Sequence, residues 1–147
     1  MKTQIKLMSA IVSGVLLSTS MAVSAADATD SAQYKAEKTA IEKRFKADKE
    51  SCDTLSGNAK DICEKQAKFT EVSALGELEA NAKGTVEARR DAEEDKAKAA
   101  YDLAREKCDD LSGNRKDVCQ KDAVADRDRM RADIKAGGTV PPQGTLR

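Results

Sequence analysis

One segment of this chain occurs twice, and all four cysteines lie at its ends. Residues 52–63 read CDTLSGNAKDIC and residues 108–119 read CDDLSGNRKDVC, so nine of the twelve positions are identical. Each copy has Ser-Gly-Asn at its centre, and these residue types favour a reversal of the chain. The repeat therefore predicts the same local structure at two places, each with a pair of cysteines around it.

The rest of the chain has a helical pattern. Between residues 29 and 136 there is no proline, and Ala, Lys, Glu, Asp and Arg predominate. Most of these residue types favour helices. Apolar residues recur with the helical period and form two clear stripes, Tyr34, Ile41, Phe45, Cys52 and Leu55 in the first half and Ala97, Tyr101, Ala104, Cys108 and Leu111 in the second. The pattern predicts an all-α fold.

Three breaks divide this helical pattern. Gly57 and Gly113 fit the left-handed residue that ends a helix. Asn58 and Asn114, which follow them, fit the N-cap of the next helix. The third break is Lys-Gly-Thr at residues 83–85, where the threonine can cap a new helix. The breaks predict four helices, at about 29–55, 59–82, 85–111 and 114–136.

These helices make one helical domain, residues 26–136, with an internal repeat of 29–82 and 85–136. Gly76 is a weaker, isolated interruption within the second helix. After residue 136 the chain reads Gly-Gly-Thr-Val-Pro-Pro. Since this composition ends a helix, we expect a disordered tail over residues 137–147.

The turns determine how the cysteines can pair. In one unbroken helix Cys52 and Cys63 would lie about 16 Å apart along the axis. A disulfide requires Cα atoms within roughly 4.4–6.8 Å, so the chain must reverse between them. Both cysteines are equally far from the turn, as are Cys108 and Cys119 from theirs. The spacing favours four helices arranged as two disulfide-stapled antiparallel helical hairpins.

A second pairing stays open. Bridges from Cys52 to Cys119 and from Cys63 to Cys108 would both be centred between Thr85 and Val86, beside the third break. The chain would then be one long, double-stapled helical hairpin. This arrangement places Ser-Gly-Asn within a helix twice, where each glycine costs about 1 kcal/mol relative to alanine. The local hairpins are therefore favoured, and disulfide mapping distinguishes the two.

The N-terminus has the pattern of a secretory signal peptide. Two lysines at positions 2 and 6 precede an apolar stretch from residue 7 to 17, and small residues follow at 23–26. We expect a signal peptide at residues 1–25, cleaved near Ala25 and Ala26. The apolar stretch is too short for a membrane span of about 20 residues. The mature chain is thus expected in the periplasm, without membrane insertion, where paired cysteines become disulfides.

Composition argues against several classes of chemistry. The chain has no histidine, the commonest acid–base residue and metal ligand at neutral pH. The cysteines of each copy are too far apart for a usual zinc motif, and no Cys-x-x-Cys occurs. Without Lys2 and Lys6 the chain has 24 positive and 26 negative side chains, so no basic surface for nucleic acid is indicated. The acidic cluster Asp91, Glu93, Glu94 and Asp95 is interpreted as a solvated helix face. We expect no catalytic residue, cofactor or metal.

The duplicated Cys-Asp-x-Leu-Ser-Gly-Asn-x-Lys-Asp-[Ile/Val]-Cys segment resembles an uncharacterised family of small exported proteins of Gram-negative bacteria, often labelled hypothetical or TolA-like. The resemblance extends over residues 83–136. Likeness to TolA reflects the Ala-, Lys-, Glu- and Asp-rich helical composition, and the processed chain lacks the TolA membrane anchor. The resemblance implies export to the periplasm and assigns no functional residue.

The expected function is that of a non-enzymatic periplasmic helical protein, either structural or bound to a partner in the cell envelope. The alternative is a stress-related periplasmic holdase chaperone. Thin apolar stripes on long helices suit coiled-coil pairing within one chain or between copies, so a homo-oligomer stays open.

Overall fold

The computed structural model describes residues 25–140. All but the last residue of the expected signal peptide, and residues 141–147, lie outside this range. All of the regular secondary structure in this range is helical and there is no strand, which confirms the predicted all-α class. The helices are α1 (Ala25–Asp30), α2 (Ala32–Cys52), α3 (Gly57–Lys83), α4 (Val86–Cys108) and α5 (Asn114–Lys135).

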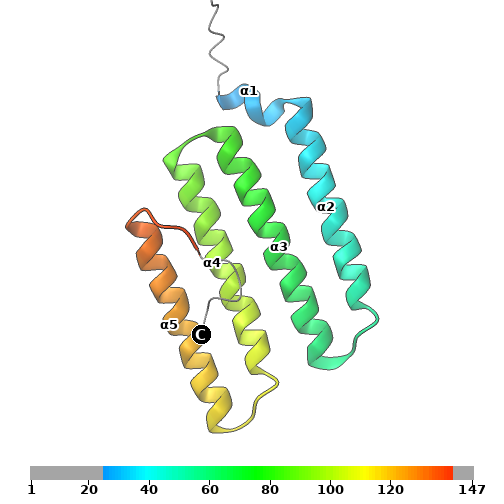
Figure 1. Cartoon of the computed structure of the whole chain (residues 1–147), viewed down its shortest axis with the longest axis vertical. Helices are drawn as coiled ribbons and strands as arrows, with labels where there is room; N and C mark the ends of the chain where they lie inside the picture. The colour runs from blue at the N-terminus through cyan, green and yellow to red at the C-terminus, as the bar shows by residue number, and fades with distance from the viewer. Residues whose placement is uncertain (1–24, 141–147) are drawn as a thin grey trace, which may run out of the picture.

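The four long helices lie side by side in chain order and form an open layer (Figure 1). Helix α3 contacts α2 and α4, and α5 contacts α4. Short α1 lies against α2 and α3 at one end of the layer. Among the described helices, α2 touches neither α4 nor α5, whereas a closed four-helix bundle would bring the outer helices together around a common core. The layer is therefore not closed into a bundle.

Local capping explains where the helices begin and end. The expected first helix, 29–55, is divided at Ser31, whose extended backbone separates α1 from α2. The Ser31 hydroxyl accepts a hydrogen bond from the Tyr34 N–H at 3.1 Å. Thr85 caps α4 as predicted, because its hydroxyl accepts from the Ala88 N–H at 3.1 Å. Gly84 ends α3 in the left-handed region, at φ 63°.

Helix α3 continues through Gly76, which the sequence marked as a weak interruption. A Cβ atom at this glycine would lie 3.0 Å from the Cβ of Ala92 and 3.3 Å from its Cα. Gly76 therefore allows α3 and α4 to approach closely at the centre of the layer.

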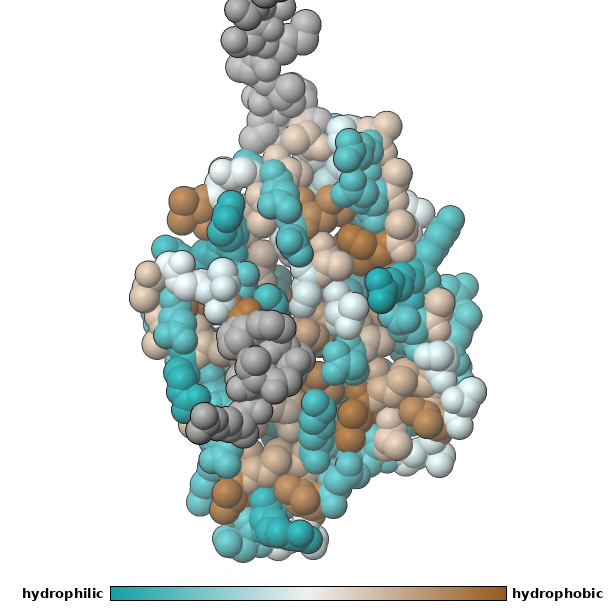
Figure 2. Space-filling model, viewed as in Figure 1, coloured by the Kyte–Doolittle hydropathy of each residue, from teal (hydrophilic) through white to brown (hydrophobic). Residues whose placement is uncertain are grey.

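The core is thin and belongs mainly to the inner helices. Its buried cluster consists of Phe69, Ala97, Ala99, Ala100, Leu103, Met130, Ile134 and Val140. Helix α2 buries only Cys52, and the other members of its predicted stripe within the helix, Tyr34, Ile41 and Phe45, are half-buried. Figure 2 shows small hydrophobic areas separated by charged side chains on the face viewed.

Residues 137–140 differ from the disordered tail expected for 137–147. The chain turns back after α5 and crosses over α4 (Figure 1). Gly137 has φ 88°, and the Gly138 N–H donates to the Asp133 carbonyl at 2.8 Å. Val140 is only 2% exposed. The buried Val140 side chain thus packs this segment against the helical layer, and residues 141–147 lie outside the described range.

Candidate functional site

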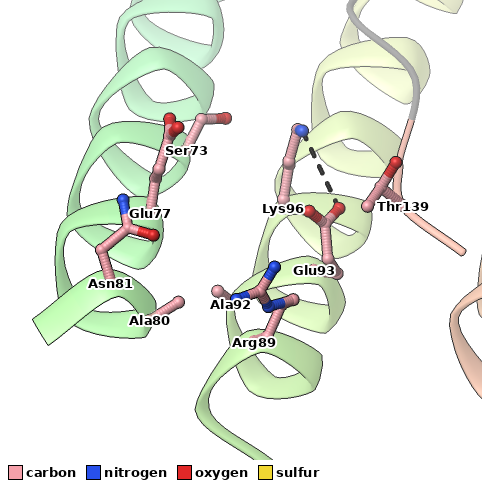
Figure 3. Close-up of a pocket in the computed structure, with 9 residues that line it drawn as sticks. All are labelled: Ser73, Glu77, Ala80, Asn81, Arg89, Ala92, Glu93, Lys96 and Thr139. Carbon is pink, nitrogen blue, oxygen red and sulfur yellow. Dashed lines mark ion pairs between the residues drawn. The ribbon is translucent and has the colours of Figure 1, made fainter. Parts of the chain in front are cut away.

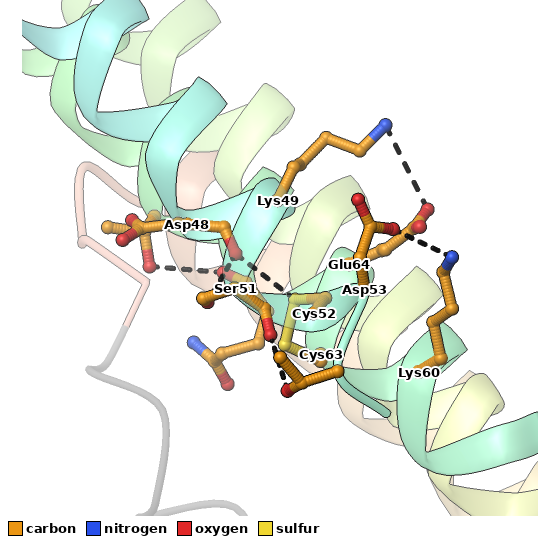
Figure 4. The surroundings of a disulfide bond; sticks show 11 residues. Asp48, Lys49, Ser51, Cys52, Asp53, Lys60, Cys63 and Glu64 are labelled. Carbon is orange, nitrogen blue, oxygen red and sulfur yellow. Dashed lines mark hydrogen bonds and ion pairs between the residues drawn. A yellow bond between two sulfur atoms is a disulfide. The ribbon is translucent and has the colours of Figure 1, made fainter. Parts of the chain in front are cut away.

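The duplicated segment forms the same disulfide-linked turn twice. Cys52 pairs with Cys63 and Cys108 pairs with Cys119, with Cα atoms 5.7 and 5.6 Å apart. Each bridge joins the last residue of one helix to the beginning of the next, and Figure 4 shows the first of them. This is the pairing that the local-hairpin interpretation predicted, and the long-hairpin pairing does not occur.

Glycine and leucine shape both turns in the same way. Gly57 and Gly113 have the positive φ that was predicted for them, 57° and 55°. The prediction that they end a helix was wrong, because Gly57 is the first residue of α3 and Gly113 is the N-cap of α5. The preceding helices end instead at right-handed C-caps, Asp53 and Asp109. The Leu55 and Leu111 N–H groups donate to the carbonyl of the first cysteine in their copy, at 2.9 and 3.0 Å. These shared main-chain features show that both copies form the same turn.

An ion pair spans each turn. Asp53 and Lys60 lie 2.8 Å apart in the first copy, and Asp109 and Lys116 lie 2.7 Å apart in the second (Figure 4 shows the first pair). The hydrogen bond from Lys60 lowers the pKa of Asp53 and raises that of Lys60. A hydrogen bond from Lys116 likewise lowers the pKa of Asp109. Because the pairs are exposed, solvent screens them and each contributes only modestly.

The prediction that Asn58 and Asn114 cap the following helices was wrong. At the start of neither α3 nor α5 does a side chain make a capping hydrogen bond. The Asn58 amide instead donates to the Glu106 carbonyl at 3.3 Å and to the Asp110 carboxylate at 2.6 Å. Asn58 therefore links the first turn to the end of α4, a contact between the two halves of the repeat.

A hollow of about 280 Å³ lies between α3 and α4 on the face that the C-terminal segment crosses. We call it the α3–α4 groove. Figure 3 shows side chains from both helices projecting toward it, with Thr139 beside them. Its lining is Ser73, Glu77, Ala80, Asn81, Arg89, Ala92, Glu93, Lys96 and Thr139. The groove thus offers charges of both signs, neutral polar groups and small apolar surfaces.

At the edge of the groove, two side chains of α4 hold the main chain of Val140. The Val140 N–H donates to Glu93 Oε2 at 2.6 Å, and Lys96 Nζ donates to the Val140 carbonyl at 3.0 Å. Glu93 and Lys96 also form an ion pair at 3.8 Å, and their side chains are 16% and 23% exposed. One residue therefore has both of its main-chain polar groups paired with side chains.

Sequence reasoning missed this arrangement. It placed Glu93 with Asp91, Glu94 and Asp95 on a solvated helix face, and the other three carboxylates are indeed exposed. Glu93 is half-buried and bound to the chain's own C-terminal segment. The one available signal was an aliphatic residue, Val140, within a glycine- and proline-rich sequence.

In the part of the chain described, no group of His, Cys, Asp or Glu side chains could hold a metal ion. Nor is any helix between residues 25 and 140 both long and apolar enough to cross a membrane. Comparisons with models of known families, with curated proteins and with solved structures find no match to this chain. The function is therefore inferred from the geometry of the chain itself.

Proposed function

We propose that this protein is a non-enzymatic helical protein of the periplasm that presents the α3–α4 groove to a protein partner in the cell envelope. One observation carries the proposal. The long helices form an open layer in which α2 touches neither α4 nor α5, so the groove face is not used to close a bundle.

The disulfides account for how an open layer can be stable. Each closes a loop with a sequence separation of 11 residues. A loop of this size contributes roughly 3 kcal/mol in the chain-entropy model. Two such staples compensate for apolar area that a closed bundle would bury, and they leave both faces free for binding. Disulfides persist in oxidising compartments, which supports a periplasmic location.

Site-specific photo-crosslinking tests the proposal. A photoreactive residue replaces Glu77 in the groove or, as a matched control, Glu42, an exposed glutamate of α2 that lies outside the groove lining. Irradiation of intact cells should give a discrete adduct from position 77 and none from position 42. An adduct of twice the chain mass would identify a second copy as the partner. No adduct at 77, or the same adducts from both positions, would contradict the proposal.

The holdase chaperone is the second candidate, and exposed apolar side chains favour it. Leu55, Val86, Val118 and Val124 are between 37% and 77% exposed. They are distributed over a turn and two helices, whereas client-binding surfaces are expected to be larger and contiguous. An aggregation-suppression assay separates the functions, because a groove-specific binder should not protect unrelated unfolded proteins at molar excess.

A further inference from the structure

We infer that the Glu93–Lys96 pair and the apolar socket beside it form a binding site for an extended peptide that carries an aliphatic residue. In the free protein Val140 fills this site. The inference rests on the proposed partner-binding function and specifies the partner as a protein that presents such a segment.

The Glu93–Lys96 pair recognises the main chain of the residue that it binds. Glu93 accepts from the Val140 N–H at 2.6 Å, while Lys96 donates to its carbonyl at 3.0 Å. Both contacts are charge-assisted, and such bonds are stronger than neutral ones. They involve only atoms that every residue except proline possesses. The pair can therefore hold the corresponding main-chain groups of another extended peptide.

The socket supplies side-chain selectivity. The Val140 side chain belongs to the buried cluster that includes Leu103, Met130 and Ile134. Within the described residues this core contains no buried polar or charged residue. A polar side chain placed in the socket would lose its hydration without gaining a partner, which is costly. The site should therefore accept small aliphatic residues and reject charged ones.

The α3–α4 groove gives such a peptide room to continue. Thr139, the residue before Val140, lies at its lining together with Glu93 and Lys96. Beyond them the hollow extends past Arg89 and Glu77, which can pair with polar or charged groups of a ligand (Figure 3). A partner's segment can thus make contacts that the chain's own segment does not.

The chain's own segment is attached to the layer in a way that permits exchange. It follows two glycines, and Gly137 has a positive φ. Among residues 136–140, the part described after α5, only Val140 is buried. A tethered segment of this kind competes with any free ligand. If it is docked in about nine of ten molecules, it lowers the apparent affinity for an external peptide about tenfold.

The test uses the full mature chain and a blocked peptide, acetyl-Gly-Thr-Val-Pro-Pro-amide, which copies residues 138–142. Its affinity is measured by NMR titration for the wild type and for Val140→Gly. We expect binding to Val140→Gly that is about tenfold tighter than to the wild type. Adding Glu93→Gln to the Val140→Gly variant should weaken peptide binding about tenfold, because a neutral acceptor replaces a charged one.

Two control peptides address the two parts of the site. A peptide with N-methylvaline keeps the side chain but lacks the N–H, and one with aspartate lacks the aliphatic group. Both should bind at least about tenfold more weakly. Equal binding of all three peptides, or no binding of the valine peptide, would overturn the inference.

The wild type provides a readout that does not depend on the folding of a variant. With labelled valine methyl groups, excess peptide should move the Val140 signals to the positions of a free chain. Unchanged Val140 signals at saturating peptide would also overturn the inference. Crosslinking from position 77 together with failure of the peptide to bind would reject the peptide site alone. Failure of the crosslinking would reject the proposed function itself.

Discussion

Loss of the first disulfide should release α2, whereas loss of the second should leave α5 docked. The perturbations are Cys52→Ala with Cys63→Ala, and Cys108→Ala with Cys119→Ala. Both bridges have a sequence separation of 11, so each removal costs about 3 kcal/mol in the chain-entropy model. The helices differ in what remains to hold them in place.

The two helices differ in how much apolar surface they bury against the rest of the layer. Apart from its cysteine, α2 offers three half-buried side chains, Tyr34, Ile41 and Phe45. At about 1 kcal/mol for each half-buried side chain, they contribute roughly 3 kcal/mol, which is comparable to the loss. Helix α5 keeps Met130 and Ile134 at 4% and 3% exposure, worth about 3–6 kcal/mol together. An isolated helix of the length of α2 is only marginally stable in water.

Hydrogen exchange measured by mass spectrometry follows each helix separately. Without the first bridge, the α2 amides should exchange about 100-fold faster, the equivalent of roughly 3 kcal/mol, while α3 and α4 keep their protection. Without the second bridge, the α5 amides should exchange more slowly than the α2 amides do in the variant without the first bridge. Unchanged α2 exchange, or equal loss of protection in every helix of both variants, would refute the reasoning.

Three further predictions concern stability. Leu103→Ala should lower the free energy of unfolding by about 3 kcal/mol, measured with denaturant, because Leu103 is fully buried. Gly76→Ala should lower the free energy of unfolding by about 1 kcal/mol net, because overpacking against Ala92 outweighs the gain in helix propensity. Adding Ala92→Gly in the same chain should relieve the overpacking. An increase in stability from Gly76→Ala alone would contradict the close approach of α3 and α4. The lowered pKa values of Asp53 and Asp109 mean that their contribution is present above the ordinary value of 3.8 and is lost as the pH falls through the folded values. Thermal unfolding from pH 6 to pH 2 should therefore show a smaller acid-induced loss in Asp53→Asn with Asp109→Asn.

What could be predicted from the sequence was local. The positive φ of Gly57 and Gly113 and the cap at Thr85 depend on a few neighbouring residues, and these were found as expected. The two glycines begin the next helix, however, and do not end the preceding one. The cysteine pairing followed because the turn lies midway between each pair. The division of the first helix at Ser31 was missed, although Asp30 and Ser31 are residue types that favour helix caps over helix interiors.

What could not be predicted depends on neighbours distant in the chain. Most of both apolar stripes is not fully buried, and Tyr101, Ala104 and Leu111 of the second are half-buried like the side chains of α2. Helix α4 instead also buries Ala99, Ala100 and Leu103, which lie off the predicted stripe, because α4 packs against both α3 and α5. Asn58 bonds to residues 48 and 52 positions away. Val140 bonds to Glu93, 47 positions away. No periodicity or capping rule contains such contacts, so both residues were assigned local roles or none.

Disulfide mapping tests the central claim, two local hairpins in an open layer, most directly. Trypsin should separate the four cysteines of the unreduced protein onto four peptides, residues 50–60, 61–65, 108–115 and 117–121. The structure predicts that mass spectrometry will find 50–60 linked to 61–65 and 108–115 linked to 117–121. Linkage of 50–60 to 117–121, with 61–65 linked to 108–115, would contradict the layer, because those bridges belong to a single long hairpin.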